Sequence, residues 1–348
     1  MPTLVCPPLK RLFTSMLCLP IMACSGWSTM PPAAQYPDNQ SKDKPFSPSS
    51  SPSLKTIKAN SHPSKTPILA PNALEQRWVV SATEAAQLIE AGATLLDARG
   101  QGLIRKRLQG SVAINWKNFS PQDAATRGRL LDDDTVLTQR LQALGVSHHT
   151  PVVVFSNPPG GWGEDGRIVW MLRTLGHQQV VLVDGGFQAL VKAGVPLQTG
   201  TPKSPQPGNF IVRRNSTWDI QRDTLKKQLG SPNFVVIDTR EPREFSGKTP
   251  YGEQRGGHIP GSINLYFKDL LDADGHLLTP QALNAKLQDI GITAATEVVV
   301  YCTGGIRSGW LASVLVSQGF SVKNYAGSMW EWSANSATQY PLETLNIR

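Results

Sequence analysis

The sequence is poor in cysteine, and its metal-ligating side chains are not arranged as a metal site. Four cysteines and six histidines occur in 348 residues, and none of them forms a CxxC or HxxxH pair. Cys6, Cys18 and Cys24 lie near the start, whereas Cys302 stands alone far downstream. Structural zinc sites need closely spaced ligand pairs. We therefore expect neither a metal nor a cofactor.

Charged residues are also scarce, at 17% of the chain against 40% hydrophobic residues. This balance is typical of a soluble globular protein, and the length suffices for two domains. Residues 1–77 hold eight Lys or Arg against three Asp or Glu, so the other 271 residues carry only +3 of the net +8. Because the body is nearly balanced, we expect no nucleic acid partner.

The first 24 residues resemble an export signal. Lys10 and Arg11 precede an apolar run over residues 12–23, which is too short to span a membrane. The tetrapeptide Ile-Met-Ala-Cys ending at Cys24 resembles a bacterial lipobox, in which the cysteine is lipidated and becomes the new N-terminus. A plain signal peptide cut nearby and a tail without a signal are the alternatives. We expect a periplasmic protein, or a lipoprotein anchored to the membrane through Cys24 and facing the periplasm.

Proline and serine dominate the stretch that follows. Residues 28–73 contain nine Pro and nine Ser, and such a composition offers too little apolar surface to form a core. We expect residues 25–75 to be a flexible tether between the signal at 1–24 and a folded body.

The body from about residue 76 repeats itself. The matching segments are 95–99 with 236–240, 108–115 with 259–264, and 151–156 with 297–302. Their order is the same in both halves, which is stronger evidence than any single match. We expect two similar domains, at 76–198 and 216–345, joined by a linker at 199–215 that includes three prolines.

Each half alternates short apolar runs with helical patterns. Val152–Phe155 and Val298–Tyr301 are continuous apolar runs, as expected for strands buried on both faces of a parallel sheet. Residues 283–290 have apolar side chains at helical spacing, and Gly291 follows as a helix stop. The pattern predicts an α/β fold in which each domain is a small parallel sheet with helices on both faces.

One loop combines a nucleophile, two glycines and a cation. It runs Cys302-Thr303-Gly304-Gly305-Ile306-Arg307, between a predicted strand and a helix expected to begin near Ser308. The helix N-terminus and the loop amides lower the pKa of a thiol. Gly304 and Gly305 let the backbone curl so that its N–H groups point at an anion or a charged sulfur. The alternative is that Cys302 is a small buried hydrophobe.

At these residues the chain resembles the rhodanese superfamily, in the tandem-domain arrangement of thiosulfate and mercaptopyruvate sulfurtransferases. The resemblance covers roughly residues 76–342. Its motifs in the second half are Asp238-Thr239-Arg240-Glu241-Pro242, Gly257-His258-Ile259-Pro260-Gly261-Ser262, the Cys302 loop, and Gly327-Ser328 before Trp330-Glu331-Trp332. In the first half they are Asp97-Ala98-Arg99, residues 166–173 and Asp184-Gly185-Gly186-Phe187.

The resemblance implies a sulfurtransferase that works through a persulfide on Cys302, as a monomer. An anionic donor, thiosulfate first and 3-mercaptopyruvate second, would be bound by Arg240, Arg307 and the loop residues Thr303, Gly304, Gly305 and Ile306. The acceptor would be cyanide or a thiol.

For Arg240, the alternative to binding the donor is a structural ion pair with Glu241 or Glu244. Asp238 and His258 are expected to support the loop and a turn, without chemistry.

The first half departs from this pattern. Ser156 takes the place of Cys302 and cannot form a persulfide, and Pro158 and Pro159 remove amides that an anion nest would need. We therefore expect residues 76–198 to be catalytically inactive and to shape the cleft between the domains.

Two other functions remain open. A cysteine phosphatase needs five residues between cysteine and arginine, whereas four separate Cys302 from Arg307, so the loop suits sulfur better than phosphate. An inactive rhodanese-like module that captures an anion or a partner is the second alternative. Trp330, Trp332 and Met329 are expected to pack in the core or the cleft wall.

Overall fold

A computed structural model describes residues 74–100, 106–199 and 204–345. The expected export signal, the lipobox cysteine Cys24 and nearly all of the tether lie outside these ranges. Within them, no helix has the length and apolar character needed to cross a membrane.

The first half is built on a five-stranded parallel sheet with the order β1-β5-β4-β2-β3. The strands are β1 (Val79–Val80), β2 (Thr94–Asp97), β3 (Val112–Ala113), β4 (Val152–Phe155) and β5 (Val180–Val183). The helices are α1 (Ala82–Glu90), α2 (Asp134–Ala143), α3 (Glu164–Thr174) and α4 (Gly186–Lys192), and a 3-10 turn, η2, spans Trp116–Phe119.

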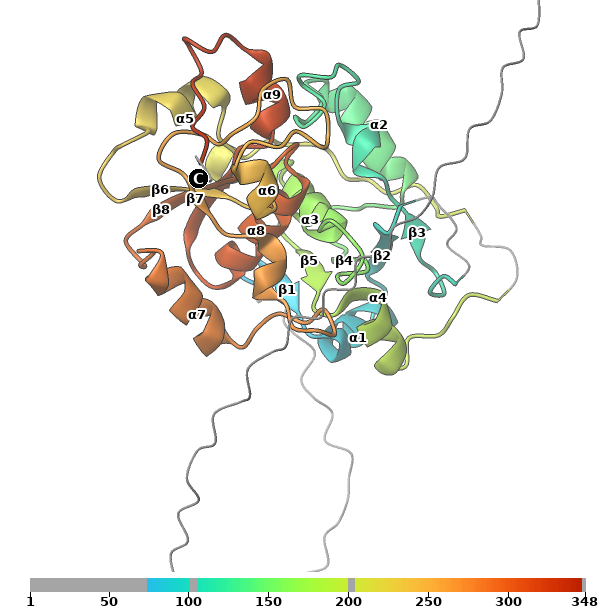
Figure 1. The fold of residues 1–348 in the computed structure, drawn as a ribbon. Coiled ribbons are helices and arrows are strands. Elements are labelled where there is room, and N and C mark those ends of the chain that lie inside the picture. Colours follow the sequence, from blue (N-terminus) through green and yellow to red (C-terminus); the bar gives the residue numbers. More distant parts are fainter. Residues whose placement is uncertain (1–73, 101–105, 200–203, 346–348) are drawn as a thin grey trace, which may run out of the picture. The chain divides into compact units, whose positions relative to one another are not determined.

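The apolar run of β4 explains the layers of this half. All four of its residues are buried, and alternate side chains face opposite sides of a sheet. Val153 and Phe155 join the cluster that includes residues of α1 and α4, which Figure 1 shows together on one side. Val152 and Val154 join the cluster that includes residues of α2 and α3. Helices therefore cover both faces, as predicted.

The second half has a four-stranded parallel sheet with the order β7-β6-β8-β9. The strands are β6 (Phe234–Asp238), β7 (Ile263–Asn264), β8 (Glu297–Tyr301) and β9 (Ser321–Asn324). The helices are α5 (Arg222–Gln228), α6 (Pro242–Phe245), α7 (Pro280–Asp289), α8 (Ile306–Ser317) and α9 (Ser328–Ala334), with 3-10 turns η3 (Ser216–Trp218) and η4 (Phe267–Leu270). The α/β class and the duplicated architecture are confirmed.

Two helix starts differ from the predicted ones. Helix α7 begins at Pro280, three residues before the predicted start, because the Thr279 side chain caps it by accepting from the Ala282 N–H and proline fits the first turn. Helix α8 begins at Ile306 and not near Ser308. Gly305, at φ 80°, supplies the left-handed conformation just before it. Arg307 is therefore fixed in the first turn of a helix.

The two halves share one core where α3 crosses α8, side by side at the centre of Figure 1. At the crossing, a Cβ on Gly166 would overlap the backbone of Trp310. Reciprocally, a Cβ on Gly309 would lie 3.0 Å from Cα of Arg167. Each helix thus presents a glycine to its neighbour, and the backbones approach closely.

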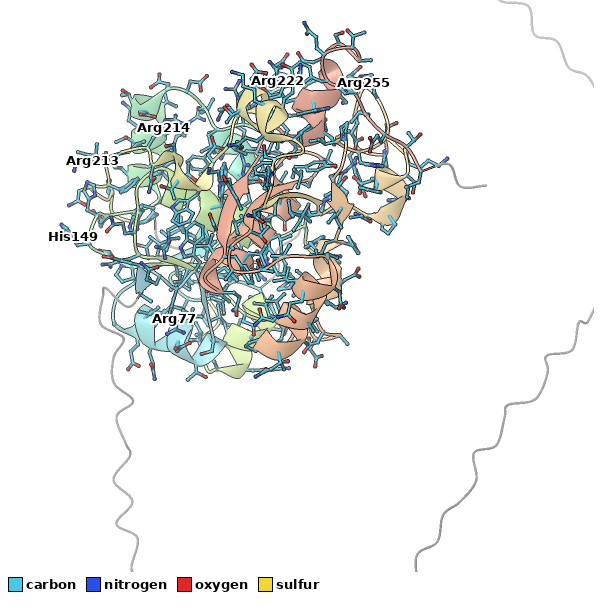
Figure 2. All side chains as sticks on the ribbon, turned by 90° about the vertical axis from the view of Figure 1, so that its left-hand side faces the viewer. Arg77, His149, Arg213, Arg214, Arg222 and Arg255 are labelled. Atoms are coloured by element: carbon cyan, nitrogen blue, oxygen red, sulfur yellow. The ribbon has the colours of Figure 1, made fainter. Side chains whose placement is uncertain are left out.

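The described part of the predicted linker is packed on the first half. The Gly208 N–H donates to the Gln142 carbonyl and the Arg213 N–H to the Leu175 carbonyl. Phe210 is buried with its ring centroid 5.2 Å from that of His177. Figure 2 shows Arg213 and Arg214 beside α2, where Arg214 Nε donates to Asp134 at 2.7 Å. This segment therefore fixes the connection to the second half.

Candidate active site

Cys302 lies between the end of β8 and the start of α8, at the carboxyl edge of the second sheet. Its backbone N–H donates to Ser328 Oγ at 3.1 Å, and its Sγ accepts from the Gly305 N–H at 3.1 Å. The residue is only 1% exposed. A loop amide thus points at the sulfur, as the glycine pattern predicts.

The surroundings of Cys302 favour its thiolate. Burial opposes ionisation, but the charge of Arg307 and hydrogen bonds from Ser308 and Gly304 outweigh it, so the pKa of Cys302 is lowered. The thiolate is the nucleophilic form of cysteine. A lowered pKa therefore increases the reactive fraction at neutral pH.

Arg307 is held in place by a buried carboxylate. It donates to both oxygens of Glu244, at 2.6 and 2.8 Å, and to Thr303 Oγ1 at 2.6 Å. Burial alone would raise the pKa of Glu244, but the hydrogen bonds and charge of Arg307 lower it. Both groups are therefore charged, and a two-pronged contact fixes the guanidinium beside the loop.

The Cys302 loop lines a pocket of about 610 Å³ to which both halves contribute. Cys302, Thr303, Gly304, Ile306 and Arg307 line it from the loop. The remaining lining includes Trp116, Lys117, Arg127 and Trp162 from the first half, and Tyr251 and Trp330 from the second. The first half thus contributes to the lining of the pocket.

The lining residues outside the Cys302 loop are not predicted from the sequence, apart from Trp330 as cleft wall. Segment 116–127 carries no motif repeated in the second half, and nothing local to it indicates that it faces Cys302. Nothing local to Glu244 indicates that it lies beside the Cys302 loop either, because it follows the Asp238-Thr239-Arg240 motif without a distinctive spacing.

Arg240 does not line the pocket, contrary to the predicted anion-binding role. It is fully buried and donates to both carboxylate oxygens of Asp238, through Nε at 2.9 Å and through Nη2 at 2.6 Å. Nη2 also donates to the Gly257 carbonyl at 2.7 Å. The ion-pair alternative describes this geometry better, with Asp238 as the partner in place of Glu241 or Glu244. Asp238 accordingly holds an arginine.

The position of His258 matches the supporting role expected for it. Its Nδ1 lies 3.0 Å from the Phe245 carbonyl, and its ring stacks on that of Phe245 with centroids 3.7 Å apart. Its backbone pairs with that of Glu343. These contacts fix a turn and leave the ring outside the pocket lining.

The loop at Ser156 corresponds to the Cys302 loop but differs from it in charge. The helix that follows it has acidic residues in its first turn, whereas the helix after Cys302 has an arginine there. Ser156 is buried, and the first turn of α3 contains Glu164 and Asp165, where α8 has Arg307. Burial raises the pKa of Asp165 to about 6. Carboxyl groups at this position disfavour an anionic sulfur.

A turn of the second half closes over the same loop. The Leu277 N–H donates to Asp184 Oδ1 at 2.8 Å, and His276 Nδ1 lies 3.3 Å from Asp184 Oδ2. A Cβ on Gly275 would lie 2.7 Å from the ring of Pro159. The loop at Ser156 therefore differs in cover and in charge from the Cys302 loop of the second half.

Comparison with known proteins decides the family. The model of the rhodanese-like domain matches this chain twice, at residues 81–193 and 221–335. The chain belongs to the rhodanese family. Among the described ranges, no cluster of three His, Cys, Asp or Glu side chains is arranged to hold a metal ion.

Named relatives agree on the enzyme class. SseB of Mycobacterium tuberculosis, named for thiosulfate sulfurtransferase activity, is 32% identical over 272 residues, covering 74% of this chain and 94% of that protein. The thiosulfate sulfurtransferase of Azotobacter vinelandii is 31% identical over 209 residues, covering 59% and 76%. The predicted assignment to tandem-domain rhodanese sulfurtransferases is confirmed.

Solved structures agree on the fold. SseA from Escherichia coli, a 3-mercaptopyruvate sulfotransferase, superposes with a TM-score of 0.62 at 22% identity, covering 72% of this chain and 98% of that one. YnjE superposes with a TM-score of 0.67 at 20% identity, covering 78% and 68%. The fold of the two rhodanese-like domains of this chain thus resembles the folds of these solved structures.

Proposed function

We propose that this rhodanese moves a sulfane sulfur from a small anionic donor to a thiophilic acceptor through a persulfide on Cys302. Thiosulfate is the favoured donor and 3-mercaptopyruvate the second, with cyanide or a thiol as acceptor. The observation that carries the proposal is that Cys302 lines a pocket and that a loop amide lies 3.1 Å from its sulfur.

The first step forms the persulfide. The Cys302 thiolate attacks the outer sulfur of thiosulfate, and the sulfur–sulfur bond of the donor breaks so that sulfite leaves with the electron pair. Arg307 and the pocket residues Lys117 and Arg127 supply positive charge toward an anionic donor. The loop amides stabilise the charged outer sulfur of the product.

The second step releases the sulfur. Cyanide or a thiolate attacks the outer sulfur of the persulfide, and the Cys302 thiolate leaves with the electron pair of the broken bond. Because its pKa is lowered by Arg307 against the effect of burial, this thiolate is a good leaving group. The enzyme returns to its starting form without an external oxidant or reductant.

A direct assay tests the proposal. Purified protein supplied with thiosulfate and cyanide is expected to produce thiocyanate, and thiosulfate alone is expected to add about 32 Da, one sulfur atom, to the peptide containing Cys302. The variant Cys302→Ser is the control. No product and no adduct with either thiosulfate or 3-mercaptopyruvate would leave an inactive binding module as the explanation.

Phosphatase activity is the weaker candidate. The loop places four residues between Cys302 and Arg307, and both terminal nitrogens of Arg307 donate to Glu244. A phosphate would have to displace that carboxylate. We expect no hydrolysis of an aryl phosphate under conditions that yield thiocyanate.

We also propose that the chain is exported, anchored through lipidated Cys24, and active as a monomer. Support comes from the basic residues, the short apolar run and the lipobox-like tetrapeptide at its start. Expression of full-length protein with a labelled fatty acid tests the anchor. Label in the wild type and none in Cys24→Ser is expected. Sedimentation of the purified protein tests its oligomeric state.

A further inference from the structure

Arg167 reaches from the inactive half to the backbone of the catalytic loop. It lies on α3, is fully buried, and its Nη1 donates to the Gly305 carbonyl at 3.3 Å across 138 residues of sequence. Gly305 is the residue whose N–H points at Cys302 Sγ. The side chain therefore holds the peptide unit that directly follows the amide facing the sulfur, and it restrains the backbone of Gly305 from that side.

The other contacts of Arg167 connect the loop to the pocket. Its Nη2 donates to the Gly128 carbonyl at 2.7 Å and to Ser120 Oγ at 3.5 Å. Ser120 lines the pocket. Asn324 of β9 is a second donor to the Gly305 carbonyl, at 3.4 Å. One guanidinium thus spans the inactive half and the catalytic loop.

Arg167 carries a charge that its hydrogen-bond partners do not neutralise. A buried arginine is normally paired with a carboxylate, whereas the three oxygens that accept from Arg167 all belong to neutral groups. Burial lowers the pKa of Arg167 to about 10, opposed by the negative charges of Cys302 and Asp219. At neutral pH the guanidinium is protonated and attracts a thiolate.

We propose that Arg167 is a positioning residue for sulfur transfer, fixing the Cys302 loop through Gly305 and stabilising the thiolate from the side of the inactive half. This rests on the proposed sulfur transfer. It also gives the inactive half a role in the chemistry, in addition to lining the pocket.

Arg167 acts among other charged groups that face the loop. Arg307, on α8, is paired with Glu244 of α6. Arg240 is paired with Asp238, and its Nη1 lies 3.9 Å from Glu253. The remaining charged groups around the pocket and Arg167 are Lys117, Arg127, Glu164 and Asp219. The test must therefore distinguish the effect of Arg167 on Cys302 from the effect of a general loss of positive charge or of folded structure.

The experiment measures the pKa of Cys302 from the pH dependence of its alkylation by iodoacetamide in wild type, Arg167→Met and Arg167→Lys. Arg167→Met is expected to raise that pKa by about one unit, because a facing positive charge is lost. Arg167→Lys keeps the charge and is expected to give a smaller shift. It is nevertheless expected to lower kcat about tenfold with little change in the KM for thiosulfate, because one ammonium group cannot bridge the same oxygens.

Arg173→Met is the matched control. Arg173 is a second buried arginine on α3, and its hydrogen bonds go to backbone carbonyls of Leu74, Glu75, Arg77 and Val180, away from the pocket. Its removal is expected to lower the melting temperature while the pKa of Cys302 stays that of wild type. An equal shift in the control, or none in a folded Arg167→Met protein, overturns the proposal. If Arg167→Met does not fold, wild-type kcat in Arg167→Lys overturns it.

Alkylation separates this proposal from the proposed function. Alkylation needs no sulfur donor. If the wild-type protein makes no thiocyanate, sulfur transfer is refuted, but the alkylation data still show whether Arg167 changes the pKa of Cys302. Conversely, an active protein in which the pKa of Cys302 stays the same when Arg167 is replaced would refute only the positioning role.

Discussion

Glu244 and Arg307 form a buried, two-pronged ion pair, with Nη1 2.6 Å from Oε2 and Nη2 2.8 Å from Oε1. The pair holds a cation beside the cysteine loop and engages both terminal nitrogens of that cation. Arg307 thus acts on Cys302 mainly through its charge and its fixed position.

Replacing Arg307 by Met is expected to raise the pKa of Cys302 by about one to two units and to lower the rate at neutral pH about tenfold. It also leaves Glu244 charged and unpaired in the interior, at a cost of about 3 kcal/mol in the free energy of unfolding. Alkylation rates against pH and urea unfolding measure the two effects.

The double variant Arg307→Met with Glu244→Gln separates stability from chemistry. It is expected to recover most of the lost stability, because no charge remains buried alone, without recovering activity. Full activity in the double variant would contradict the role assigned to the Arg307 charge.

Moving the thiol to the first half is expected to fail. In Cys302→Ser with Ser156→Cys, the new thiol lies in a loop covered by the turn at Gly275 and followed by acidic residues at the start of α3. We expect no thiocyanate and no sulfur adduct at position 156 by mass spectrometry. An adduct there would show that the covered loop opens to a donor.

Asp165 makes the stability of the protein depend on pH. Burial raises its pKa from 3.8 to about 6. The folded protein therefore holds this proton more tightly than the unfolded chain, and the contribution of Asp165 to stability falls as pH rises through that window. Asp165→Asn is expected to gain about 2 kcal/mol at pH 7 and little at pH 3.5. Equal unfolding midpoints for both proteins at pH 7 would contradict this.

The glycine at the helix crossing is expected to be intolerant of a methyl group. Gly166→Ala places a Cβ against the backbone of Trp310 and should cost about 3 kcal/mol of unfolding free energy. Gly194→Ala is the control, since only its left-handed φ of 89° opposes the change and nothing lies within 4 Å. We expect it to cost about 1 kcal/mol. Similar losses in the two variants would argue against a close crossing.

The sequence predicts well what local patterns encode. The apolar runs of β4 and β8, the repeated motifs and the glycines after Cys302 are visible without a structure, because burial on both faces and tight backbone turns restrict composition. The α/β class, the duplication and the site of the loop follow from them.

Contacts between distant segments could not be predicted in this way. Nothing near Arg167 indicates that it meets Gly305, which lies 138 positions away, and nothing near Trp116 indicates that it faces Cys302. Arg240 shows the converse limit of a local motif. The motif predicts an anion site, whereas the side chain folds back on Asp238, two positions earlier, and does not line the pocket.

The glycine contacts between α3 and α8 restrict how the enzyme can move. Two backbones that touch without intervening side chains cannot slide or separate without breaking the shared core. The close crossing therefore opposes a hinge opening between the halves. We expect access to the pocket to depend on motions of individual lining side chains, such as Trp162, which is 38% exposed. Rotation of such an exposed side chain takes place in picoseconds to nanoseconds.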